Sequence, residues 1–166
     1  MFQRDYILRM IEQLTEAVGY LLGLKRKRNH AEALRFIDDW FERHLRMRLG
    51  LIDKLLPDDL VRLHAIGGVV DTAALQATAR LLKEAADIQD EIGEEDAAYH
   101  RRVKSLQLYI KLTELQPDTA LDDPDEAAEA LLAALKGYAL PPEAVRAVAL
   151  WRERSEERRV GKECRL

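Results

Sequence analysis

Apolar and polar positions alternate with the period of an α-helix near the start of the chain. Five apolar residues follow one another at steps of three and four: Ile7, Ile11, Leu14, Val18 and Leu21. This spacing places them on one helix face and predicts an amphipathic helix over residues 4–25. Leu8 and Leu22 widen the apolar stripe, which favours packing in a globular bundle over an isolated coiled coil.

The same period continues to about residue 153. Further helices are predicted at 29–47, at 57–66, at 71–93, at 94–117, at 123–138 and at 140–153. β-Branched residues nowhere alternate with polar ones over the length of a strand, so no sheet is expected. The pattern predicts an all-α fold of six to seven antiparallel helices in a single domain over residues 1–153.

Several helix boundaries carry recognisable end signals. Asp71 is placed to cap one helix, and Gly93 supplies its left-handed stop. Asp123 followed by Pro124 is a cap with proline at the first helical position. Gly67-Gly68 is expected to end the short helix that begins at Pro57.

The predicted helix after Gly93 has a broad apolar face that mixes small and large residues. Val103, Leu106 and Ile110 follow one line, and Ser105 and Tyr109 lie beside it. Small residues next to large ones let two helices approach closely. Ser105 is therefore interpreted as a packing residue and not as a nucleophile.

Composition is that of a water-soluble globular domain. The 166 residues are 48% hydrophobic and 34% charged, and no apolar run approaches the ~20 residues of a membrane span. The first ten residues lack the pattern of a secretory signal, so a cytoplasmic location is expected. The segment 154–166 is charged and without an apolar stripe, and it is interpreted as a non-native or disordered tail.

Charge favours a basic partner over nucleic acid. The net charge is −4, and acidic residues cluster over 87–96 and over 118–129. Long-range attraction would steer a basic protein or peptide toward them. Solvated helix ends are the favoured explanation of these clusters, and attraction of a basic partner is the alternative. The basic run 25–28 fits the last turn of a helix, with a small anion-binding patch as its alternative.

Side chains with chemical potential are few and scattered. Cys164 is the single cysteine, and of the four histidines only His100 has a carboxylate four residues away, at Asp96. Gly67-Gly68 lacks the third glycine and the lysine of a phosphate loop. No catalytic residue, metal or cofactor is predicted, and the chain is not expected to be an enzyme.

One segment resembles a tetratricopeptide repeat. VKSLQLYIKLTELQPD is similar to the second helix of such a repeat, with Ser105, Tyr109 and Pro117 in the small, aromatic and closing positions. HAEALRF resembles the same repeat more weakly, with Ala33 in the small position. Trp40 stands where that family has a small residue. The resemblance implies helical hairpins that present a binding surface.

A second resemblance covers nearly the whole chain except the tail. QRDYILRMIEQLTEAVGYLLGL and the helical remainder through Trp151 are similar to a family of small, all-helical bacterial proteins, chiefly from Gram-positive genomes. That family brings no assigned catalytic residues. It implies a repeat-like helical fold and leaves the activity open.

These features predict a non-catalytic scaffold that binds another protein or peptide. The candidate interaction surface combines aromatic and acidic residues: Trp40, Tyr99, Tyr109, Asp87, Asp90, Glu91, Glu94 and Glu95. Trp40 and Trp151 fit the core as well as a partner surface, with the core favoured. One alternative is a homodimer through the first helix or through Leu49–Leu56. Another is a small-molecule or enzymatic site near His64, His100 and the tyrosines.

Overall fold

The computed structural model describes residues 2–118 and 120–165. Eight helices lie within these residues: α1 (Phe2–Arg26), α2 (His30–Leu45), α3 (Leu49–Lys54), α4 (Pro57–Leu63), α5 (Thr72–Glu91), α6 (Glu95–Leu115), α7 (Pro124–Ala134) and α8 (Pro142–Glu163). The all-α prediction is confirmed. The six to seven helices predicted become eight, because Leu49–Lys54 forms a short helix of its own.

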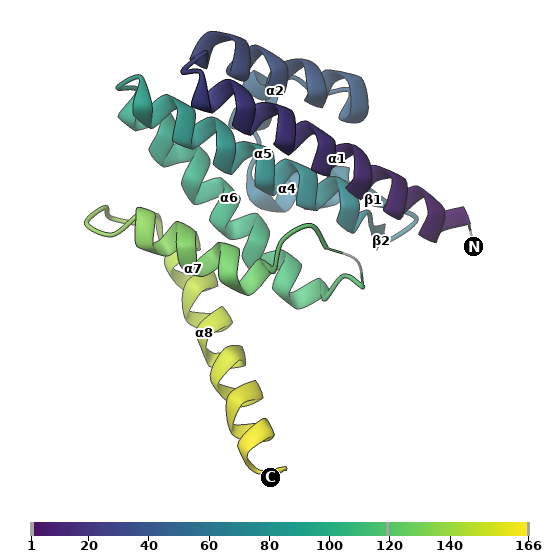
Figure 1. Cartoon of the computed structure of the whole chain (residues 1–166). Coiled ribbons are helices and arrows are strands. Elements are labelled where there is room, and N and C mark those ends of the chain that lie inside the picture. Colours follow the sequence, from purple (N-terminus) through teal and green to yellow (C-terminus); the bar gives the residue numbers. More distant parts are fainter. Residues whose placement is uncertain (1, 119, 166) are drawn as a thin grey trace.

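Helix α5 is the centre of the fold. It packs against α1 and α2 on one side and against α6 on the other, and α6 in turn carries α7 and α8 (Figure 1). Of the 20 residues of α5, 14 are buried. Such a helix, apolar around most of its circumference, is enclosed by its neighbours instead of facing water on one side.

The predicted starts of α5 and α7 are confirmed at the level of individual hydrogen bonds, whereas α7 ends at Ala134 and not at residue 138. Asp71 accepts a bond from the backbone N–H of Ala74 at 3.1 Å. Asp123 accepts one from the N–H of Asp125 at 2.9 Å. Gly93 has a φ of 84°, in the left-handed region that glycine tolerates best. Local capping chemistry therefore sets both helix starts.

Helices α2 and α6 end at left-handed residues that are not glycine. Arg46 follows α2 with a φ of 53°, and Gln116 follows α6 with a φ of 48°. In both cases the cap N–H closes onto a carbonyl of the last turn. These hydrogen bonds close each turn, although a side chain at the left-handed position disfavours that backbone conformation.

A two-stranded hairpin corrects the expectation that no sheet is present. β1 (Ala65–Ile66) and β2 (Val69–Val70) pair antiparallel, with Ile66 opposite Val69. Gly67 and Gly68 have φ values of 59° and 82°, as the tightest hairpin turn requires at both central residues. The glycine pair was interpreted only as a helix stop, because two-residue strands are too short to show an alternating pattern.

The apolar stripe of α1 is narrower than predicted. Leu8 and Leu22 are 40% and 36% exposed, whereas Met10, Leu14 and Leu21 are buried. Helix α1 packs mainly against α2 and α5, and these two neighbours cover one face of it. Residues at the edge of the stripe therefore remain in contact with water.

Residues 154–163 belong to the segment that the sequence predicts to be a non-native or disordered tail. They continue α8 as regular helix, beyond Trp151, whose side chain is buried. This part of α8 extends away from the other helices (Figure 1) and is mostly exposed. The absence of an apolar stripe in the sequence reflects this exposure.

Close approach of α5 and α6 depends on Ser105. Its side chain is fully buried, and its hydroxyl donates to the backbone carbonyl of Ala79 on α5 at 2.7 Å. A larger side chain would push the two helices apart. The interpretation of Ser105 as a packing residue is confirmed.

We expect Ser105→Leu to destabilise the fold more than Ser105→Ala. Alanine removes one hydrogen bond, worth about 1 kcal/mol, and keeps the helix spacing. Leucine adds volume to a packed interface, which typically costs about 1–3 kcal/mol in addition. Urea unfolding followed by circular dichroism measures both. Equal destabilisation by the two variants would show that the spacing of α5 and α6 is not limited by this side chain.

Candidate binding site

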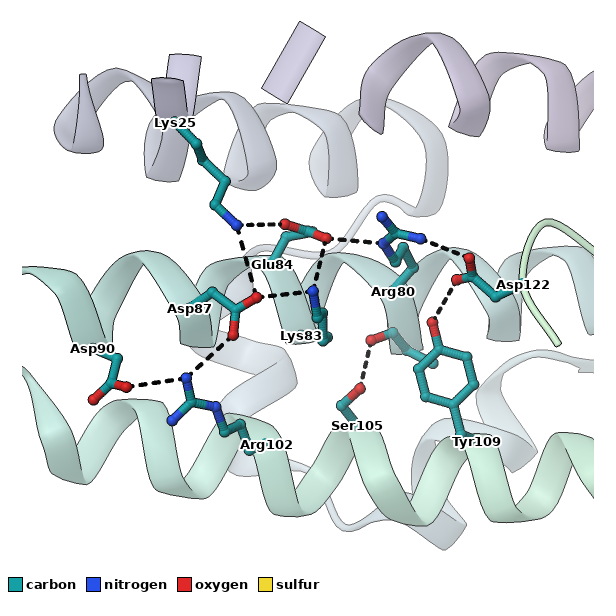
Figure 2. A network of polar contacts seen from close by, with 11 residues as sticks. Lys25, Arg80, Lys83, Glu84, Asp87, Asp90, Arg102, Ser105, Tyr109 and Asp122 are labelled. Atoms are coloured by element: carbon teal, nitrogen blue, oxygen red, sulfur yellow. Dashed lines mark hydrogen bonds and ion pairs between the residues drawn. The ribbon is translucent and has the colours of Figure 1, made fainter. Parts of the chain in front are cut away.

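A network of charged side chains joins α1, α5, α6 and the segment before α7. In this network each cation contacts carboxylates and each carboxylate contacts one or more cations. Its members are Lys25, Arg80, Lys83, Glu84, Asp87, Asp90, Arg102 and Asp122 (Figure 2). Five of them lie on one face of α5, at spacings of three and four residues. The network is therefore built on the most deeply packed helix of the fold.

Glu84 is the buried centre of this network. Its side chain is 1% exposed and contacts three cations: Lys25 at 3.0 Å, Arg80 at 2.9 Å and Lys83 at 3.3 Å. Burial alone would raise the pKa of Glu84, but these cations outweigh burial and hold the pKa below its ordinary value. Glu84 is therefore ionised at neutral pH.

Asp87 extends the network to α6. Lys83 binds Asp87 at 2.9 Å. Nη2 of Arg102 binds Asp87 at 3.1 Å and also binds Asp90 at 3.2 Å. Burial acts to raise the pKa of Asp87, but the hydrogen bonds and charges of Lys83 and Arg102 lower it overall. This carboxylate ties α5 to α6 at Arg102, three residues before Ser105.

Asp122 closes the other end of the network. Asp122 accepts one hydrogen bond from Nη1 of Arg80 at 2.6 Å and another from the hydroxyl of Tyr109 at 2.9 Å. Burial, together with the charge of Asp122, raises the pKa of Tyr109 well above its ordinary value. Tyr109 therefore keeps its proton and acts as a hydrogen-bond donor.

The network forms one wall of a slot between α5, α6 and α7. The slot holds about 270 Å³. Arg80, Lys83, Asp87, Arg102, Tyr109 and Asp122 form the charged wall, and Asp123, Glu126, Ala127, Ala130, Leu131 and Ala134 line the side of α7. The alanines leave room that larger side chains would fill. This slot, with a charged wall facing an alanine-rich one, is the candidate binding site.

The aromatic members of the predicted interaction surface are not exposed. Trp40 and Tyr109 are 7% and 2% exposed, and Trp151 is buried as well, so the core interpretation of both tryptophans is confirmed. Tyr99 is half-buried and donates its hydroxyl to the carbonyl of Ala139. The sequence shows that these rings lie on apolar stripes, but it does not show which stripes neighbouring helices cover.

The acidic members divide into paired and exposed groups. Asp87 and Asp90 are neutralised within the network by Arg102. Glu91, Glu94 and Glu95 are exposed around the turn between α5 and α6. Of these three, Glu91 lies 3.5 Å from His30 and Glu94 accepts a bond from Gln89 at 3.2 Å. The structure thus separates residues that the sequence places in one cluster.

Sequence reasoning missed half of the network. Arg80, Lys83, Glu84 and Arg102 were not singled out, because charged residues inside a helix are normally solvent-facing. A signal was present in α5, where these charges interrupt a run of alanine and leucine on what would be a buried face. Such charges require partners from adjacent helices.

The histidines do not form a shared site. His64 is buried and shares a hydrogen bond with Thr78 at 3.1 Å, while His100 is exposed beside Tyr99. Within residues 2–118 and 120–165, no group of three or more His, Cys, Asp or Glu side chains is arranged to hold a metal ion. In the same residues, no helix is long and apolar enough to cross a bilayer.

Comparisons with protein-family models, with curated proteins and with solved structures find no match to this chain. The geometry of the slot and its charges is therefore the basis for proposing a function.

We expect Glu84→Gln to destabilise the protein by about 3 kcal/mol at neutral pH, because it leaves three partly buried cations without their shared carboxylate. Thermal and urea unfolding measure the change. Glu91→Gln is the matched control: this side chain is 49% exposed, and its loss should cost under about 1 kcal/mol. Equal effects of the two substitutions would contradict the central role of Glu84.

We also expect stability to fall in acid. A carboxyl with a lowered pKa in the folded chain stabilises it above the unfolded pKa, and this contribution is lost as the pH falls through the folded pKa. For Glu84 and Asp87 the ordinary values are 4.5 and 3.8, so the loss should begin below about pH 5. Urea unfolding from pH 7 to pH 3 should show a smaller acid loss in Glu84→Gln than in the wild type.

Proposed function

We propose that this chain is a non-catalytic helical scaffold that binds a peptide segment of another protein in the slot between α5, α6 and α7. The carrying observation is that a fixed charge network and an alanine-rich helix face enclose the same space. Sites with both features are prepared for a ligand that has polar groups and an apolar body.

The rigidity of the slot supports binding. Arg80, Lys83 and Arg102 each contact two carboxylates, so their positions are set before any ligand arrives. A preorganised site spends less free energy on ordering its own side chains. Affinity can then come from a small contact area.

The state of the ionisable groups favours binding over catalysis. The lowered pKa of Asp87 and the raised pKa of Tyr109 keep both groups in one protonation state near neutral pH. A general acid or base works best with a pKa near the operating pH. The slot therefore supplies fixed charges and hydrogen-bond donors.

Its size suits part of a peptide. Sites for drug-sized ligands commonly occupy about 300–1,000 Å³, and this slot lies at the lower limit. A few consecutive side chains would fill it. The rest of a partner would then lie over the rim formed by Asp123 and Glu126.

The exposed charges near the slot support a partner that is basic. Glu126 on the rim and Glu94 and Glu95 at the start of α6 are exposed carboxylates. They would attract a basic segment over distances up to about a Debye length. The paired acids Asp87 and Asp90 add little to this attraction, because Arg102 already balances them.

The tetratricopeptide-like resemblance agrees with this proposal. Its motif lies on α6, which forms a hairpin with α5 around Gly93 and carries Tyr109 toward the slot. Helical hairpins of this kind present grooves for extended or helical peptides. We propose that the α5–α6 hairpin is the repeat-like unit and that α7 completes its groove.

We expect Ala130→Trp to abolish peptide binding, since Ala130 is exposed and lines the slot. Peptides selected against the wild-type chain from a displayed library should lose at least about tenfold in affinity for this variant. Fluorescence anisotropy with the labelled peptides measures the loss.

Ala133→Trp is the matched control. Ala133 is exposed on the same helix but does not line the slot. It should leave both affinity and stability unchanged. Selection that yields no binding peptide, or peptides that bind both variants like the wild type, would refute the proposed function.

A further inference from the structure

The slot has two chemically different ends. Antiparallel packing brings Asp122 next to Tyr109, and it brings Ala139 next to Tyr99. Asp123 and Glu126 therefore lie at the end marked by Tyr109, and Ala134 lies at the end marked by Arg102. On α5, Arg80 lies at the end marked by Tyr109, and Asp87 lies at the end marked by Arg102.

The length of the slot follows from helix geometry. Arg102 and Tyr109 are seven residues apart on α6, as are Arg80 and Asp87 on α5. At 1.5 Å per residue, both pairs span about 10 Å. Alanine and leucine side chains of α7 line the distance between the ends.

The end near Tyr109 has acidic groups without a cation. Glu126 is exposed and forms no ion pair within residues 2–118 and 120–165. Asp123 uses one carboxylate oxygen for capping α7. Asp122, by contrast, is balanced by Arg80. This end therefore carries uncompensated negative charge and suits a cationic group.

The other end has basic groups with unused donors. Nη2 of Arg102 makes both of its ion pairs, and within residues 2–118 and 120–165 its Nη1 forms neither an ion pair nor a hydrogen bond. The side chain of Arg102 is 12% exposed and lines the slot. Lys83 contacts two carboxylates and has a third N–H. A carboxylate entering here would satisfy donors that the network leaves over.

We infer that the slot recognises a dipolar ligand, with its cationic group at Asp123 and Glu126 and its carboxylate at Arg102 and Lys83, about 10 Å apart. This inference rests on the proposed function and specifies the ligand class of that site. In an extended peptide, a spacing of about 10 Å corresponds to a basic and an acidic group three residues apart.

Linear ω-amino acids measure this spacing directly. The probes are 4-aminobutyrate, 6-aminohexanoate and 8-aminooctanoate, of which the last separates its charges by about 10 Å when extended. We expect 8-aminooctanoate to bind about fivefold more tightly than 4-aminobutyrate, because only the longer chain reaches both ends. Amide chemical shifts of residues 127–134 follow each titration.

Singly charged probes test each end separately. Octylamine and octanoate should each bind about fivefold more weakly than 8-aminooctanoate. Glu126→Gln should weaken 8-aminooctanoate and octylamine but not octanoate. Lys83→Gln should weaken 8-aminooctanoate and octanoate but not octylamine. Glu129→Gln, an exposed carboxylate outside the slot, is the matched control and should change none of them.

The outcomes separate this inference from the proposed function. Equal affinity for all three amino acids, or binding that survives Ala130→Trp, overturns the dipolar inference. If library peptides bind in the slot while the amino acids show no dependence on length, the scaffold function stands and the inference falls. If the amino acids show the expected order but no peptide binds, the slot recognises dipolar small molecules and the peptide-binding function falls.

Discussion

The fold depends on one buried carboxylate more than on any other polar group. Glu84 lies in the middle of the most deeply packed helix, where an unpaired charge would destabilise the fold. Its three cations come from α1 and from α5 itself. Because Arg80 and Lys83 also bind Asp122 and Asp87, the same constraint fixes the segment before α7 and the position of α6. Structure and candidate site thus share their charges.

This sharing explains why the slot lies where it does. Side chains that satisfy Glu84 and Asp87 are held toward α5, and they cannot also fill the space beneath α7. Helix α7 presents Ala127, Ala130 and Ala134 to that space, so packing leaves it open. Exchange of the charges for apolar residues of equal volume would be tolerated energetically in many proteins. Retaining them supplies donors and acceptors at the wall of a cavity.

Periodicity and caps were sufficient to predict the all-helical fold and its main boundaries. Asp71, Gly93 and Asp123 act within a few residues of themselves, so their roles can be inferred without tertiary information. The network could not be inferred in the same way. Whether Arg102 faces water or Asp87 depends on the rotation of α6 against α5, and that rotation is set by many weak contacts together. The exposure of Leu8 and the burial of Trp40 depend likewise on which neighbours cover each face.

The left-handed residues that follow α2 and α6 have a consequence for engineering this protein. Arg46 and Gln116 adopt a backbone conformation that disfavours any side chain with a Cβ, by about 1 kcal/mol each. Glycine would remove this strain, although it gains freedom in the unfolded chain. Substitution at these two solvent-facing turns could therefore raise the free energy of unfolding. Such a gain would offset destabilising changes introduced elsewhere in an engineered variant.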